Sequence, residues 1–93
     1  MKTFIWNNEK NHLLKTERQI AFEDIIFHIE MGFLLDVLEH LNQEKYKGEK
    51  IFVVQVDDYV YLVPFIKSEA EIFLKTIIPS RKATRKYMKG GSK

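Results

Sequence analysis

The sequence contains no cysteine, only two prolines and only four glycines among its 93 residues. Without cysteine the chain has neither a disulfide scaffold nor a thiolate zinc site, and His12, His28 and His40 do not follow a metal-ligand spacing. No apolar run approaches the roughly 20 residues that cross a bilayer, and residues 1–10 lack the features of a secretory signal. We therefore expect a cytoplasmic protein that uses no metal or cofactor and enters no membrane.

The residues that are present favour a folded domain. Hydrophobic residues make up 45% of the chain, aromatic residues 13% and charged residues 30%, which is too apolar for a disordered tail. A chain of this length has room for one core, so we expect a single domain over residues 1–93, with residues 90–93 as a flexible tail.

The small net charge of +2 hides an uneven distribution along the chain. Residues 75–93 carry seven basic residues and no acid, whereas residues 1–74 hold the other eight basic residues against all thirteen acids, a net −5. A basic end of this kind is typical of proteins that bind polyanions.

The first half of the chain predicts one strand and two helices, followed by another strand. Residues 2–6 suit a strand, and Asn7 can cap a helix over residues 8–18. A second helix is predicted over residues 21–31, where apolar residues recur at helical spacing and Gly32 can end the helix. Residues 33–41 fit a helix or a strand, and we favour a strand over residues 34–39.

The second half reads as sheet followed by a basic helix. Strands are predicted over residues 51–56, 59–66 and 71–78, the first two joined by a tight turn at Asp57 and Asp58. Pro79 ends the last strand, and Ser80 can cap a helix over residues 81–89. The expected fold class is α+β: an antiparallel sheet of four to five strands, two N-terminal helices and one C-terminal helix.

Two segments resemble the BrnT family of toxins from type II toxin-antitoxin systems. The N-terminal segment FIWNNEKNHLLKTERQIAFEDI resembles the start of the family, with matching residues at Trp6, Asn7, Lys10, Phe22, Glu23 and Asp24. The segment IIPSRKATRKY resembles its end, with matching residues at Arg81, Lys82, Ala83 and Tyr87.

This resemblance implies a fold similar to that of the RelE ribonucleases and a metal-independent endoribonuclease that stops translation. It also implies a cognate antitoxin, commonly a ribbon-helix-helix protein, and so a toxin-antitoxin hetero-oligomer. The chain departs from the family at two places. Glu17 and Arg18 stand where the family commonly has Lys-His before its Gly-(Val/Ile)-Ser-Phe-Glu stretch, and Thr76 stands where it has an arginine, with Lys75 one position away.

Metal-free RNA cleavage needs a base for the 2′-OH proton, cations for the developing phosphorane charge and an acid for the leaving oxygen. We expect Arg81 and Lys82 to meet the phosphate, Glu17 or Glu23 to act as base and Tyr87 to act as acid or stacking ring. Arg18 would act as a cation only, because arginine does not act as a base at neutral pH. The basic residues expected to bind RNA are Lys75, Arg81, Arg85, Lys86 and Lys89.

Other interpretations of these residues stay open. The basic helix can be a solvated face or an antitoxin-docking surface without catalysis, and Glu23 can serve only to complement the dipole of its helix. Tyr59 and Tyr61, which alternate along one strand, can form a base-stacking platform or a hydrophobic cover. The alternative function is therefore a non-catalytic RNA-binding or protein-binding regulatory module that keeps the fold.

Overall fold

The computed structural model describes residues 2–40, 42–45 and 47–88. Its elements, in chain order, are β1 (Thr3–Trp6), α1 (Asn8–Arg18), α2 (Phe22–Glu30), β2 (Leu34–Glu39), β3 (Glu49–Val56), β4 (Tyr59–Lys67), β5 (Glu71–Leu74), β6 (Ile78–Pro79) and α3 (Arg81–Met88). The α+β class, the two N-terminal helices, the C-terminal helix and the strand over residues 34–39 are thereby confirmed. Lys89, which was predicted to bind RNA, and residues 90–93, which were predicted to form a flexible tail, lie outside the described residues.

Within the described residues the sheet has six strands in the order β1-β5-β4-β3-β2, and β6 also pairs with β4. Strands β2 to β6 pair antiparallel, as predicted, but β1 pairs parallel with β5. A strand as short as β1 carries no signal for the direction of its partner strand, whose paired residues lie 68 positions further along the chain, so the sequence did not reveal this mixed edge.

The strand predicted over residues 71–78 is interrupted. Between the Phe65–Leu74 pair and the Leu62–Ile78 pair, β4 advances by three residues and the facing segment by four, so one extra residue bulges out. Pro64 lies opposite this interruption and has no N–H to donate, although its carbonyl accepts from Lys75 N at 2.9 Å. The break therefore separates β5 from β6.

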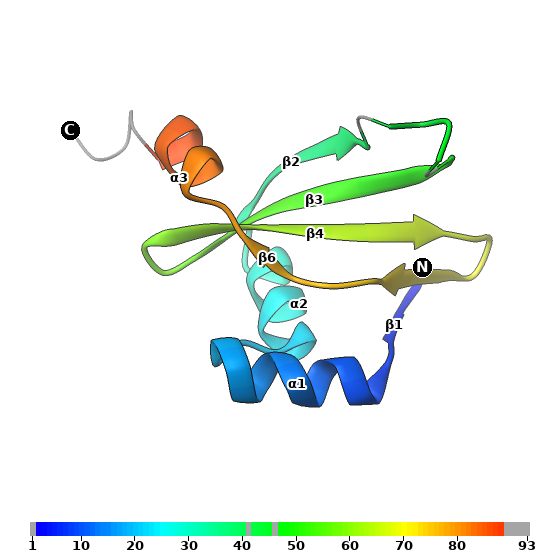
Figure 1. Cartoon of the computed structure of the whole chain (residues 1–93), viewed down its shortest axis with the longest axis horizontal. Helices are drawn as coiled ribbons and strands as arrows, with labels where there is room; N and C mark the ends of the chain where they lie inside the picture. Colours follow the sequence, from blue (N-terminus) through cyan, green and yellow to red (C-terminus); the bar gives the residue numbers. More distant parts are fainter. Residues whose placement is uncertain (1, 41, 46, 89–93) are drawn as a thin grey trace.

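The helices divide between the two faces of the sheet. Helices α1 and α2 lie on one side, and α3 lies on the other side near the β3–β4 hairpin (Figure 1). The side with two helices holds the larger core, in which Phe22 and Ile25 are fully buried and the rings of Phe52 and Phe65 stack at 3.8 Å between centroids. We call this side the α1/α2 face, and the other side the α3 face.

Asn11 ties α1 to the start of α2. Its side chain is buried, its Oδ1 accepts from Phe22 N at 2.8 Å, and its Nδ2 donates to Glu23 Oε1 at 2.9 Å. Asn11 thereby satisfies a helix-terminal N–H group that has no partner within α2. Among the described residues no helix is long and apolar enough to cross a membrane.

Candidate RNA-binding and acid-base site

Helix α3 is fixed to the sheet at its first turn. Ser80 Oγ accepts from Ala83 N at 3.0 Å and caps the helix as predicted. Ser80 N donates to Val60 O at 3.0 Å, and Val60 N donates to Thr84 Oγ1 at 2.9 Å. Ala83 is buried against Val60 and Val53. These contacts hold the basic helix in a defined position on β4.

The position of α3 separates its cations into two rows. Lys82 and Lys86 line a groove of about 390 Å³ between α3 and the sheet. Arg81 and Arg85 are exposed and stand outside the residues that line this groove. Each row has like charges at i and i+4, which costs a few tenths of a kcal/mol per pair. Arg81 and Lys82 also stand in the first turn, where the helix dipole already presents positive charge.

Tyr87 contacts Asp36, an acid of β2 that the sequence analysis did not assign to this site. Its hydroxyl donates to Asp36 Oδ2 at 2.9 Å, while Asp36 Oδ1 accepts from Val37 N at 2.8 Å. Burial, and then the hydrogen bond to the Asp36 carboxylate and the charge of Asp36, raise the pKa of Tyr87 above its ordinary value. Tyr87 is therefore a neutral hydrogen-bond donor at pH 7. Its ring also lies 5.3 Å from the Lys86 ammonium.

A β-bulge in β2 turns the side chain of Asp36 toward this site. Leu34 pairs with Val54 and packs in the core of the α1/α2 face, whereas Asp36 pairs with Val53, so the register shifts between them. Without that shift, strict alternation would place Asp36 on the same face as Leu34. The bulge instead turns Asp36 to the α3 face, beside Leu35. The sequence signal that could have pointed to Asp36 was an acidic side chain between apolar residues in the segment LLDVLE.

The other expected acids and the expected cation of α1 lie elsewhere. Glu17 and Arg18 are exposed at the end of α1, and Glu23 is at the start of α2, so all three belong to the helices that cover the α1/α2 face. The hydrogen bond from Asn11, and then one from the backbone, lower the pKa of Glu23 below its ordinary value. The structure thus brings Arg81, Lys82, Arg85, Lys86 and Tyr87 together, and leaves Glu17, Arg18 and Glu23 apart from them.

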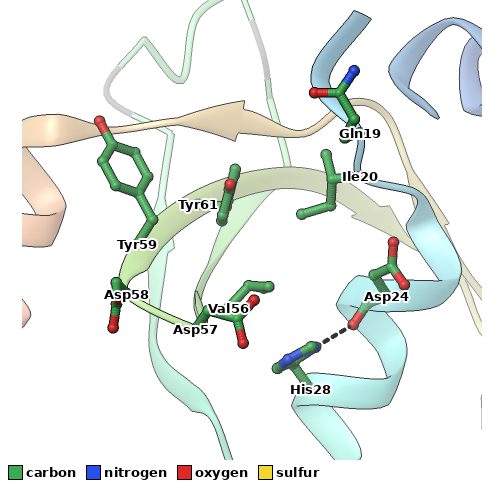
Figure 2. A pocket seen from close by; sticks show the side chains of 9 residues that line it. All are labelled: Gln19, Ile20, Asp24, His28, Val56, Asp57, Asp58, Tyr59 and Tyr61. Carbon is green, nitrogen blue, oxygen red and sulfur yellow. Dashed lines mark hydrogen bonds between the residues drawn. The ribbon is translucent and has the colours of Figure 1, made fainter. Parts of the chain in front are cut away.

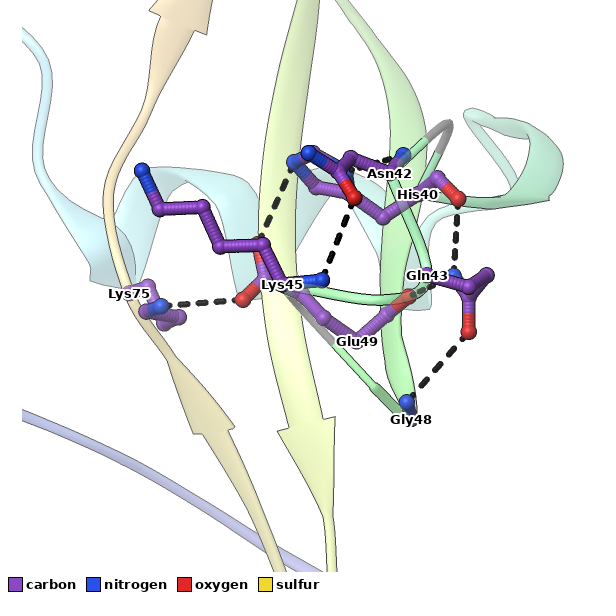
Figure 3. A network of polar contacts seen from close by, with 7 residues as sticks. All are labelled: His40, Asn42, Gln43, Lys45, Gly48, Glu49 and Lys75. Atoms are coloured by element: carbon purple, nitrogen blue, oxygen red, sulfur yellow. Dashed lines mark hydrogen bonds and ion pairs between the residues drawn. The ribbon is translucent and has the colours of Figure 1, made fainter.

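Lys75 belongs to a separate polar network on the α3 face (Figure 3). Its Nζ lies 2.9 Å from Oε1 of the buried Glu49, and His40 Nε2 lies 3.8 Å from the other carboxylate oxygen. His40 Nδ1 accepts from Asn42 N at 3.1 Å, so the ring proton of a neutral His40 is on Nε2. Lys75 therefore compensates a buried carboxylate, which accounts for its position.

A second cavity, of about 380 Å³, lies between the start of β4 and α2 (Figure 2). It is lined in part by Asp24, Asp57 and Asp58 and by the rings of Tyr59 and Tyr61. Burial, and then Tyr59 and Asp57, raise the pKa of Tyr61. Negative surroundings of this kind repel phosphate, so this cavity suits the hydrophobic-cover interpretation of the two tyrosines better than a platform for RNA bases.

Within the described part of the chain, no group of three or more His, Asp or Glu side chains is placed to hold a metal ion. Comparison of the chain with protein-family models, with curated proteins and with solved structures finds no match.

Proposed function

We propose that the chain is a BrnT-type toxin with a RelE-like fold that acts on RNA in the cytoplasm through the α3 face. In this proposal an antitoxin, of the ribbon-helix-helix class, neutralises it in a hetero-oligomer. The observation that carries the proposal is the set of four cations on α3, a helix that has no acid and that Ser80, Ala83 and Thr84 hold against β4. Cations crowded at the start of a helix repel one another, and a bound phosphate relieves that repulsion.

The backbone between α1 and α2 supports the resemblance to the family. Gln19, which follows Arg18 at the position of the family's glycine, has φ +54° and ψ +36°. This left-handed conformation is the one that glycine adopts at least cost. Ala21, at the position of the family's serine, is the N-cap of α2 and has no side-chain acceptor. The local geometry is therefore one that the family's Gly-x-Ser stretch would suit.

The proposed chemistry uses the residues that the α3 face brings together. Asp36 takes the proton of a ribose 2′-OH, and the 2′ oxygen attacks the adjacent phosphorus. The bond from phosphorus to the 5′ oxygen breaks as Tyr87 gives its proton to that oxygen. Asp36 then passes the ribose proton to the Tyr87 phenolate along the hydrogen bond between them, so both groups return to their starting state. Lys82 and Lys86 balance the charge of the phosphorane. The products are a 2′,3′-cyclic phosphate and a 5′-hydroxyl end.

The test is incubation of the purified chain with end-labelled single-stranded RNA in the presence of EDTA. We expect fragments that end in 2′,3′-cyclic phosphate. Asp36→Asn and Tyr87→Phe should abolish cleavage but leave RNA binding within about twofold, because neither change removes a cation. The matched control is Glu17→Gln, which changes an acid on the other side of the sheet. Equal cleavage by wild type and Asp36→Asn would reject the assigned base.

One observation favours a second candidate function, a non-catalytic RNA-binding module. Glu17, Arg18 and Glu23, the residues expected to supply a base and a further cation, are on the helices of the α1/α2 face. RNA binding that weakens steeply with salt, without fragments under any of the conditions above, would select this alternative.

A further inference from the structure

The groove between α3 and the sheet has an apolar, uncharged floor. Leu38, Ile51 and Leu62 form this floor, and Tyr87 lines the groove from α3. The floor is accessible, since Leu38 keeps 37% of its surface exposed. The volume of about 390 Å³ lies within the range of pockets that bind small ligands. The groove therefore has room for one flat, partly apolar group.

An aromatic side chain beside an aliphatic floor suits a nucleobase. Proteins that hold a single base stack it between aromatic and apolar side chains and read its Watson–Crick edge by hydrogen bonds. Here Tyr87 supplies the ring, and Leu38 and Ile51 supply the aliphatic surface. Stacking alone does not distinguish the four bases, because every base has a π-face. A polar group of the groove must make that distinction.

Glu39 is the acid that lines this groove. It lies at the end of β2, and its side chain is exposed. Glu39 is the cross-strand partner of Lys50, but no ion pair joins the two, and within the described residues the acid that forms ion pairs is Glu49. The carboxylate of Glu39 is therefore available to a ligand.

An ionised carboxylate only accepts hydrogen bonds, so it selects a base by the donors of that base. Guanine presents two donors side by side, N1–H and N2–H, which match the two oxygens of a carboxylate. Adenine and cytosine each present one amino donor beside a ring nitrogen that only accepts. Uracil presents N3–H between two carbonyl oxygens, and both of these repel a carboxylate. Glu39 should therefore favour guanine most and uracil least.

The position of Glu39 fits the geometry of the proposed reaction. Asp36 and Glu39 are three residues apart on β2, or about 10 Å along the strand. A nucleoside whose 2′-OH reaches Asp36 can extend its base along the groove to the side chain of Glu39. Its 3′ phosphate then lies on the side of Lys82 and Lys86. The base in the groove thus belongs to the nucleotide whose 2′-OH attacks.

We propose that this groove is a guanine site and that Glu39 determines the base after which the RNA is cut. The base lies between Tyr87 and the aliphatic floor, and Glu39 accepts from its N1–H and N2–H. Lys82 and Lys86 hold the phosphate on the 3′ side of the guanosine. The cleavage rests on the proposed function, whereas binding of guanine in the groove does not.

Binding of the four nucleoside 3′-monophosphates to the full chain tests the site without any cleavage. By isothermal titration calorimetry, guanosine 3′-monophosphate should bind roughly tenfold more tightly than uridine 3′-monophosphate, with the other two between them. Glu39→Gln keeps the size of the side chain but replaces one acceptor by a donor, so it should lower the preference for guanine over adenine by roughly fivefold or more. The control Glu30→Gln removes the same charge at the end of α2 and should keep the preference of the wild type.

A second pair of variants tests the floor. Leu38→Ala should weaken binding of guanosine 3′-monophosphate by roughly fivefold, because it removes apolar surface that the base covers. Val37→Ala, at the neighbouring position and outside the residues that line the groove, should not. Equal binding of the four nucleotides by the wild type would overturn the proposal. An equal change of preference in Glu39→Gln and Glu30→Gln would also overturn it.

An end-labelled RNA that contains all sixteen dinucleotide steps supplies the remaining arm. The wild type should cut after guanosine, and Glu39→Gln should spread the cuts over other bases. Cleavage without a base preference overturns the guanine site and leaves the proposed function standing. Selective binding of guanosine 3′-monophosphate without cleavage of any RNA does the reverse. A preference for guanine only on the 3′ side of the cut would overturn the assignment of the groove to the attacking nucleotide.

Discussion

The two faces of the sheet differ in what their side chains do. On the α1/α2 face, α1 and α2 bury a large core that includes Phe22 and Ile25 at full burial. On the α3 face, the buried cluster consists of Val53, Val60 and Ala83, and the remainder is a groove with lysines on its rim. One face therefore supplies most of the stability, and the other keeps cations and apolar surface accessible.

The electrostatics of the two faces differ in the same way. The cavity beside α2 is lined by three aspartates, whereas α3 presents Arg81, Lys82, Arg85 and Lys86. Glu49 and Lys75 offset each other at the other end of the α3 face. Residues 1–74 carry a net negative charge and residues 75–93 a net positive one. In the fold, the aspartates of the first part line the cavity beside α2, and the cations of the second part lie on α3. A polyanion would meet repulsion at one and attraction at the other.

The largest expected effect is on stability and tests the division of the core. Phe22→Ala removes a fully buried ring from the α1/α2 face and should lower the free energy of unfolding by about 3–5 kcal/mol. Leu62→Ala, on the partly exposed floor of the groove, should cost less than half as much. Urea denaturation of both variants measures this. Equal losses would show that the two faces contribute alike.

The next effect tests the joint between α1 and α2. Asn11→Leu leaves the buried Phe22 N–H without its acceptor, which should cost about 1–3 kcal/mol. His12→Leu, at the neighbouring exposed position, is the control and should be close to neutral. Thermal unfolding followed by circular dichroism compares the two. A loss no greater for Asn11→Leu than for His12→Leu would contradict the role of Asn11.

A smaller effect, of opposite sign, tests the start of α2. Ala21→Ser supplies a side-chain acceptor at the N-cap of α2, where Ala21 has none, and should stabilise the chain by up to about 1 kcal/mol. Ala70→Ser, in the exposed turn before β5, should change nothing measurable. Chemical denaturation of both variants decides the point. A destabilised Ala21→Ser variant would mean that the site has no room for the hydroxyl.

The smallest effect concerns pH and the Tyr87–Asp36 pair. Because the folded pKa of Tyr87 is raised, its neutral form contributes stability that is present below the ordinary value of 10.0. That contribution is lost as pH rises through the folded pKa. Tyr87→Phe should therefore cost a few tenths of a kcal/mol at pH 7 and weaken the loss of stability above about pH 10. Stability measured from pH 7 to 11 tests this, and an unchanged alkaline slope would contradict it.

The regular elements were predictable because their signals are local. The spacing of Phe22, Ile25 and Ile29 determines the buried side of α2, and Ser80 begins α3 as its position after Pro79 suggested. The alternation of residues 51–56 and 59–66 likewise predicts β3 and β4. These features depend on neighbours within a few residues, so the sequence pattern alone contains them.

The site was less predictable because it depends on irregular pairing. The bulge at Leu35 turns Asp36 to the α3 face, and nothing in the alternation of residues 34–39 indicates it. The interruption opposite Pro64 depends on pairing with β4, and the choice of Glu49 as partner for Lys75 joins residues 26 apart. Long-range register decides these features, and short sequence windows do not contain it.

RNA binding as a function of salt tests most directly the claim that the α3 face is the polyanion surface. Arg81→Ala/Arg85→Ala and Lys15→Ala/Arg18→Ala each remove two exposed cations, the first pair from α3 and the second from α1. With a single-stranded RNA oligonucleotide, the first variant should bind more weakly, with a log-log salt slope shallower by about 1.4, while the second keeps the wild-type slope. Equal slopes for both variants, or a shallower slope for the α1 variant alone, would contradict the assignment of RNA binding to the α3 face.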